Sequence, residues 1–125
     1  MAEFLGGWKR DLRCGEVSEA LAGQQVTLMG WVQRSRNMGG VIFVWLRDVS
    51  GIVQAVFNAD KLDQKTFELG VSLRSEYVVA LKGEVALRDA SAVNEQMATG
   101  KVEVLVKEAK LLNAAETPPI YVEDG

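Results

Sequence analysis

Two aromatic side chains occupy alternating positions in the apolar run Val41–Arg47. In a strand, alternate side chains point to opposite faces, so Phe43 and Trp45 share one face with the terminal arginine, and the aliphatic residues between them share the other. An aromatic face that looks at solvent can stack on flat groups such as unpaired bases. Arg34 and Arg36 lie just upstream and supply positive charge where a phosphate backbone would pass. The alternative is a strand buried on both faces, and the run alone leaves it open.

The side chains of the common catalytic and metal sites are largely missing from the sequence. There is no histidine, and Cys14 is the single cysteine. A Ser-His-Asp triad, a Cys-His pair, a structural zinc site and an intramolecular disulfide are therefore excluded within this chain. We interpret Cys14 as a small, semi-buried hydrophobic residue. The composition favours a binding function over catalysis.

The charge of the chain is unevenly distributed. Its 125 residues, 48% of them hydrophobic, are enough for one domain with a real core. The net charge of -3 and the pI near 5.0 argue against a general polyanion binder. Residues 1–47, however, hold six basic and four acidic side chains, against eight and thirteen in the rest. This distribution predicts selective, weak-to-moderate binding by one face.

No stretch of the sequence predicts a membrane segment. The apolar runs are too short to cross a bilayer, and the first residues do not form the basic-then-apolar pattern of a signal peptide. We therefore expect a cytoplasmic protein with no membrane partner.

Five strand-like segments and one amphipathic helix are predicted to position these residues. A short helical turn at residues 16–22, ended by Gly23, precedes them. Alternating apolar residues predict strands, a short link at Ser50-Gly51 predicts a hairpin between the second and third strands, and apolar residues at helical spacing predict the helix. The strands are expected at residues 26–33, 41–48, 52–57, 77–88 and 101–112, and the helix at 60–75.

Three strands, a helix and two strands is the order of the oligonucleotide-binding (OB) fold, an all-β, five-stranded Greek-key barrel with one α-helix between strands 3 and 4. In that fold, one sheet face and the loops after the first and fourth strands bind nucleic acid. Here we expect those loops at residues 35–40 and 89–100. The fold alone establishes no function.

Several ordered motifs resemble the N-terminal anticodon-binding domain of bacterial aspartyl-tRNA synthetases, which are class II enzymes of the aspartate, asparagine and lysine subgroup. The resemblance runs from about Arg13 through nearly the whole chain. The related lysine and asparagine enzymes share some early elements but fit the later segments less well. The motifs are Cys14-Gly15-Glu16, Gly30-Trp31-Val32-Gln33-Arg34, Gly39-Gly40-Val41-Ile42-Phe43, Leu46-Arg47-Asp48, Gly51-Ile52-Val53-Gln54, Met97-Ala98-Thr99-Gly100 and Thr117-Pro118-Pro119-Ile120.

The resemblance implies base-reading roles for three residues. Phe43 matches the aromatic residue that stacks on an anticodon base, and a stacked base contributes about 1–3 kcal/mol. Gln54 and Glu103 match the polar side chains that read base edges. A carboxylate also repels phosphate, so Glu103 would favour discrimination over affinity. Without the resemblance, Glu103 is an ordinary solvent-facing strand residue.

Four further residues complete the expected RNA-binding set. Arg34 and Arg36 match a basic cluster, and Arg88 matches a position at the mouth of the fourth-strand loop; all three are assigned to phosphate or sugar contacts. The alternative is that all three are ordinary surface arginines in contact with solvent. Trp45 stands where the family commonly has an acidic residue, and it either extends the stacking surface or is covered by Trp8 and the leader.

The resemblance also implies that the chain is a fragment. We expect an N-terminal leader and short helix at residues 1–24, the OB domain at 25–113, and at 114–125 the start of a hinge to a missing catalytic domain. The fragment would bind the anticodon stem-loop of aspartate tRNA and would hold no cofactor. Aspartate activation with ATP and Mg²⁺ would belong to the parent, an aspartate-tRNA ligase that is expected to be a homodimer.

Two other functions stay open at this point. A barrel that binds single-stranded nucleic acid without base preference would not need Gln54 and Glu103. A structural or dimer-interface barrel would bury Phe43 and Trp45 against protein and bind no RNA. Whether asparagine tRNA is also accepted depends on loop contacts that the sequence leaves undetermined.

Overall fold

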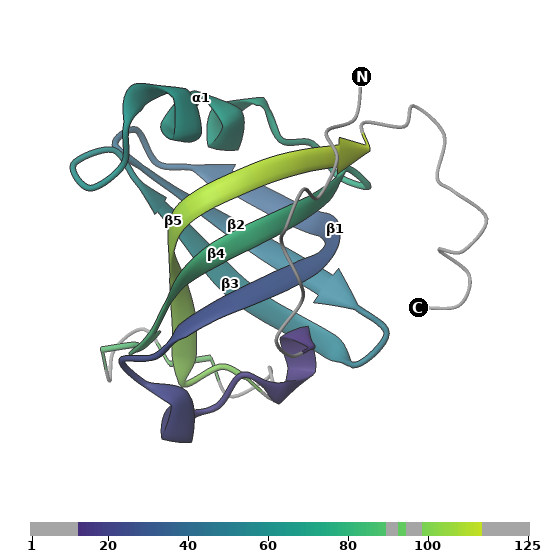
Figure 1. The fold of residues 1–125 in the computed structure, drawn as a ribbon, viewed down its shortest axis with the longest axis vertical. Helices are drawn as coiled ribbons and strands as arrows, with labels where there is room; N and C mark the ends of the chain where they lie inside the picture. The colour runs from purple at the N-terminus through teal and green to yellow at the C-terminus, as the bar shows by residue number, and fades with distance from the viewer. Residues whose placement is uncertain (1–12, 90–92, 95–98, 114–125) are drawn as a thin grey trace.

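The five predicted strands form and close into a barrel in the computed structural model of the chain (Figure 1). The structure describes residues 13–89, 93, 94 and 99–113. Trp8, the residues 1–12 around it and the predicted hinge at 114–125 lie outside the described residues. The elements in chain order are η1 (Cys14–Glu16), η2 (Glu19–Leu21), β1 (Gln25–Asn37), β2 (Val41–Asp48), β3 (Gly51–Asn58), α1 (Gln64–Ser72), β4 (Val78–Leu87) and β5 (Val102–Asn113).

The strand order around the barrel is β1-β2-β3-β5-β4, and β4 pairs with β1 to close it. All neighbours are antiparallel except β3 and β5, which run parallel. The β2–β3 hairpin is present as predicted, with Asp48 opposite Gly51. Because α1 lies between β3 and β4 in the chain, the predicted OB architecture is confirmed.

The aliphatic faces of the strands fill the barrel. Burying one such side chain contributes about 1.5–3 kcal/mol, so this alternation fixes which face of each strand looks outward. Leu87 is 56% exposed, because β4 ends there and the loop begins. The fully buried interior includes Leu28, Val32, Ile42, Val44, Leu46, Val53, Phe57, Val79, Leu81, Val85, Val102 and Val104.

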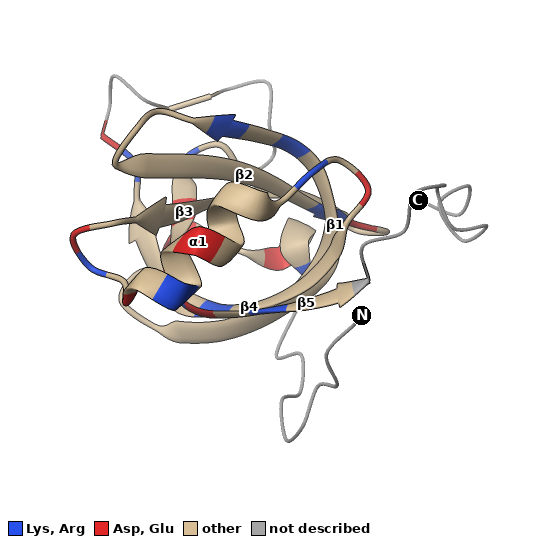
Figure 2. Ribbon diagram, turned by 90° about the horizontal axis from the view of Figure 1, so that it is seen from above, with Lys and Arg blue, Asp and Glu red and all other residues tan. Residues whose placement is uncertain are grey.

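Helix α1 covers one opening of the barrel (Figure 2). It is shorter than predicted because Asp63 caps it, with a carboxylate that accepts from the backbone N–H of Thr66. Gly70 lets the helix approach the core: a Cβ at this position would lie 2.7 Å from Cδ2 of Phe57. The helix therefore packs closely against the core at this opening.

A hydrogen bond holds the segment before β1 against the β2–β3 turn. Two 3-10 helices replace the single predicted turn, and Gly23 follows with a φ of 87°. Cys14 is fully buried, and its backbone N–H donates to the Asp48 carboxylate at 2.8 Å. The same carboxylate accepts from the N–H and hydroxyl of Ser50. Asp48 thus joins two segments that are distant in the sequence.

Candidate nucleic-acid interface

The outer face of β2 carries the two aromatic rings of the predicted site, both half-buried. Phe43 lies opposite Arg36 of β1, and Trp45 lies between Arg34 of β1 and Gln54 of β3. Residues paired across neighbouring strands point to the same face of a sheet. The register therefore gathers two rings, two guanidinium groups and an amide on one surface.

A β-bulge in β1 turns the arginines outward. Val32 pairs with Leu46 and Arg34 with Trp45, so Gln33 is an extra residue between them. Val32 is fully buried, and strict alternation would point Arg34 into the core as well. The extra residue resets the alternation, so Arg34 lies on the outside with Trp45.

Strand β1 also extends further than predicted. It continues to Asn37, so the loop expected at residues 35–40 is reduced to residues 38–40. Asn37 accepts from the N–H of Gly39, whose φ is 93°, a conformation that suits glycine. Arg36 therefore stands on a hydrogen-bonded strand and not on a loop.

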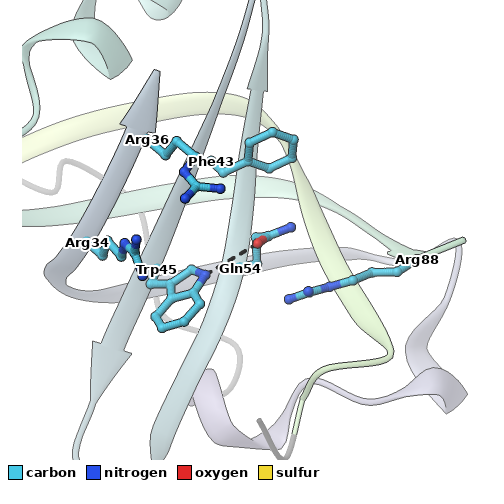
Figure 3. Close-up of a pocket in the computed structure, with 6 residues that line it drawn as sticks. All are labelled: Arg34, Arg36, Phe43, Trp45, Gln54 and Arg88. Carbon is cyan, nitrogen blue, oxygen red and sulfur yellow. Dashed lines mark hydrogen bonds between the residues drawn. The ribbon is translucent and has the colours of Figure 1, made fainter. Parts of the chain in front are cut away.

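Six side chains line one hollow on this face (Figure 3). Its volume is about 260 Å³, below the ~300–1,000 Å³ of clefts that enclose drug-sized ligands. The hollow is shallow and open, so it suits flat groups laid on a surface. Its lining residues are Arg34, Arg36, Phe43, Trp45, Gln54 and Arg88.

Trp45 is held from two sides. The guanidinium carbon of Arg34 lies 5.6 Å from the centre of its ring, which is cation–π distance. On the other side the indole Nε1–H donates to Oε1 of Gln54 at 3.3 Å (Figure 3). The amide of Gln54 in turn donates through Nε2 to Oε1 of Glu103 at 3.1 Å. Glu103 is thereby tied to the site from β5, although it does not line the hollow itself.

Arg88 reaches the hollow from the end of β4. Its Nε–H donates to the backbone carbonyl of Val102 at 3.0 Å, which anchors the guanidinium over the start of β5. Burial lowers the pKa of Arg88, and the nearby charge of Glu103 raises it. Burial is the larger of the two effects, so the pKa of Arg88 lies below its usual value.

The structure brings all seven predicted RNA-binding residues together, directly or through one hydrogen bond. Their roles toward RNA stay predictions. Arg47 and Asp48 are neighbours in β2, and among the described residues they form no ion pair with one another. The two side chains leave β2 on opposite faces, and Arg47 donates to Gln33 at 2.8 Å. Neither the bulge nor this contact has a signal in a single sequence.

The described residues contain no cluster of three or more His, Cys, Asp or Glu side chains that could hold a metal ion. Over the same ranges, no helix is both long and apolar enough to cross a lipid bilayer.

A family model and several known proteins match this chain. The tRNA anti-codon family model, described as an OB-fold nucleic acid binding domain, matches residues 26–112. An aspartate–tRNA ligase of Listeria monocytogenes is 52% identical over 117 residues, which is 94% of this chain and 20% of that protein. An aspartate–tRNA(Asp/Asn) ligase of Syntrophotalea carbinolica is 49% identical over 125 residues, the whole of this chain and 21% of that protein.

A solved structure agrees with these sequence matches. Asparaginyl-tRNA synthetase from Pyrococcus horikoshii, complexed with asparaginyl-adenylate, superposes with a TM-score of 0.72 at 34% identity, over 94% of this chain and 26% of that one. The chain spans about a fifth of the length of the curated ligases that it matches.

Proposed function

We propose, because this chain belongs to the tRNA anticodon family of OB-fold nucleic acid binding domains, that it binds the anticodon stem-loop of an aspartate tRNA on the outer face of β2, β3 and β5. The observation that carries the proposal is the register of β1, β2 and β3. It places two aromatic rings, two arginines and the Gln54 amide side by side around an open hollow.

Each kind of side chain has a role that fits its chemistry. Bases splayed out of the loop stack on Phe43, with Trp45 as a second flat surface, at about 1–3 kcal/mol for each stacked base. Gln54 and Glu103 read base edges with their amide and carboxylate groups. The three arginines, Arg34, Arg36 and Arg88, contact phosphate or sugar.

The proposed parent protein is a cytoplasmic, homodimeric aspartate-tRNA ligase whose catalytic domain uses ATP and Mg²⁺. The matched relatives support this reading, since they carry that name and are about five times longer than this chain. We place aminoacylation in the rest of that parent protein and assign no step of it to the residues of this chain. Their task is to orient the tRNA.

Binding of the chain to an aspartate tRNA anticodon stem-loop tests this function. The probe is compared with single-base anticodon variants at one fixed, moderate salt concentration. We expect the base variants to bind more weakly, and Phe43→Ala to lose about five- to 150-fold in affinity, the equivalent of one stacked base.

The other outcomes correspond to the two alternatives. Equal binding to every anticodon variant would mean a barrel that holds single strands without reading them. No binding to any stem-loop would shift the function to a protein interface that uses the same aromatic face.

A further inference from the structure

Gln54 stands between two neighbours of opposite hydrogen-bonding chemistry. The indole Nε1–H of Trp45 can only donate, and it meets Oε1 of Gln54. The carboxylate of Glu103 accepts, and it meets Nε2. Turning the amide by 180° would set two donors against each other at Trp45 and two acceptors against each other at Glu103. The chemistry of the neighbours therefore fixes the orientation of this amide.

An amide with a fixed orientation discriminates between base edges better than an amide that can rotate. An unrestrained glutamine can exchange its oxygen and nitrogen, and so can satisfy a base edge that presents either a donor or an acceptor. In this chain one N–H and one lone pair of Gln54 are already used. The remaining N–H and lone pair stand in one spatial order, so a base edge with the reversed order leaves unpaired groups.

Trp45 is itself held in the position that this task requires. It pairs with Gln54 across β2 and β3 and with Arg34 across β1 and β2. The Arg34 guanidinium covers the ring, and the Nε1 edge faces Gln54 (Figure 3). The indole N–H can therefore orient the Gln54 amide whether or not a base stacks on the ring.

We propose that Trp45 is a positioning residue for Gln54, and that its indole N–H determines which base edge can pair with the Gln54 amide. This inference rests on the proposed function and adds a specificity determinant to it. Stacking and positioning make different demands on Trp45: stacking needs the ring, and positioning needs the N–H.

Trp45→Phe separates the two demands, because it keeps an aromatic ring beside Arg34 and removes the donor. The measurement is the ratio of dissociation constants between single-base anticodon variants and the aspartate tRNA anticodon stem-loop. A neutral hydrogen bond is equivalent to roughly a three- to tenfold change, so we expect the ratio at the base read by Gln54 to fall by that factor. Trp45→Ala, which also removes the ring, should additionally weaken binding to every stem-loop.

A double-mutant cycle with Gln54→Ala is the decisive control. If Trp45 acts through Gln54, Trp45→Phe changes discrimination in the wild-type background and leaves it unchanged in the Gln54→Ala background. Equal effects in both backgrounds, an unchanged ratio, or uniform weakening of all stem-loops by Trp45→Phe would overturn the positioning role while base reading itself stands. A wild-type chain that shows no base preference would overturn the proposed function and this inference together. Thermal unfolding of each variant verifies that it is folded.

Discussion

Glu103 brings a negative charge to a face that otherwise carries arginines. Its Oε1 accepts from Gln54, and its charge acts on Arg88. A carboxylate there repels any phosphate that is wrongly placed, and it accepts only from base edges that present N–H groups. Its contribution should therefore be to selectivity more than to affinity.

Replacing Glu103 by glutamine tests this role. Glu103→Gln keeps an oxygen that can accept from Gln54 and removes the charge. One partly exposed charge contributes about 0.5–1 kcal/mol, so we expect non-cognate anticodon stem-loops to bind about two- to fivefold more tightly and the discrimination ratio to fall. Glu108→Gln is the matched control, since Glu108 is exposed on the same strand, opposite Lys82. Similar changes in both variants would indicate a general charge effect.

Asp48 is the link between elements, because its carboxylate holds η1 against the β2–β3 turn. It is 7% exposed and accepts from the backbone of Cys14 and from the backbone and hydroxyl of Ser50. Burial raises the pKa of Asp48, but the hydrogen bonds from Ser50 and Cys14 outweigh it and hold the pKa below its usual value. The folded chain therefore favours the ionised carboxylate.

The sign of the pH dependence follows from that shift. The unfolded pKa is about 3.9, so the stabilisation is complete above that pH and is lost as the pH falls through the lower folded pKa. Asp48→Asn should lower the free energy of unfolding at pH 7 by about 1–3 kcal/mol, because its NH₂ group cannot accept from these donors. The loss should shrink below pH 4. Urea unfolding at pH 7 and pH 3 measures both effects, with the exposed Asp60→Asn as control; an equal loss at the two pH values would contradict the assignment.

The elements that the sequence predicted well are those governed by local periodicity. Ile42, Val44 and Leu46 alternate with half-buried residues because a strand has period two, and all three are fully buried. The bulge at Gln33 could not be predicted, because no residue type in the strand marks the position of an extra residue. Helix α1 begins later than predicted because Asp63 caps its N-terminus. The prediction of residues 60–75 used only the spacing of apolar residues, which does not locate a cap.

At the scale of the whole molecule, the site is assembled from four strands, β1, β2, β3 and β5, and from the residue that follows β4. Phe43 and Trp45 could be recognised from β2 alone. Gln54 and Glu103 lie 49 residues apart and meet only because β3 and β5 pair in parallel, so spacing could not bring them together. They were predicted from a family resemblance. Arg88 likewise depends on the antiparallel pairing of β4 with β5, at the end of which it donates to the Val102 carbonyl.

The charge of the whole chain determines how salt should act on binding. The net charge is -3, so attraction to RNA must come from the arginines around the hollow. For single strands, each phosphate contact contributes about -0.7 to the slope of log K against log salt, so three arginines predict a slope near -2. Arg36→Ala should weaken binding to all stem-loops alike and reduce the slope by about 0.7, whereas Lys65→Ala on α1 should change neither. A much steeper slope, or an equal effect of Lys65→Ala, would mean that RNA is held by charge spread over the surface and not by this face.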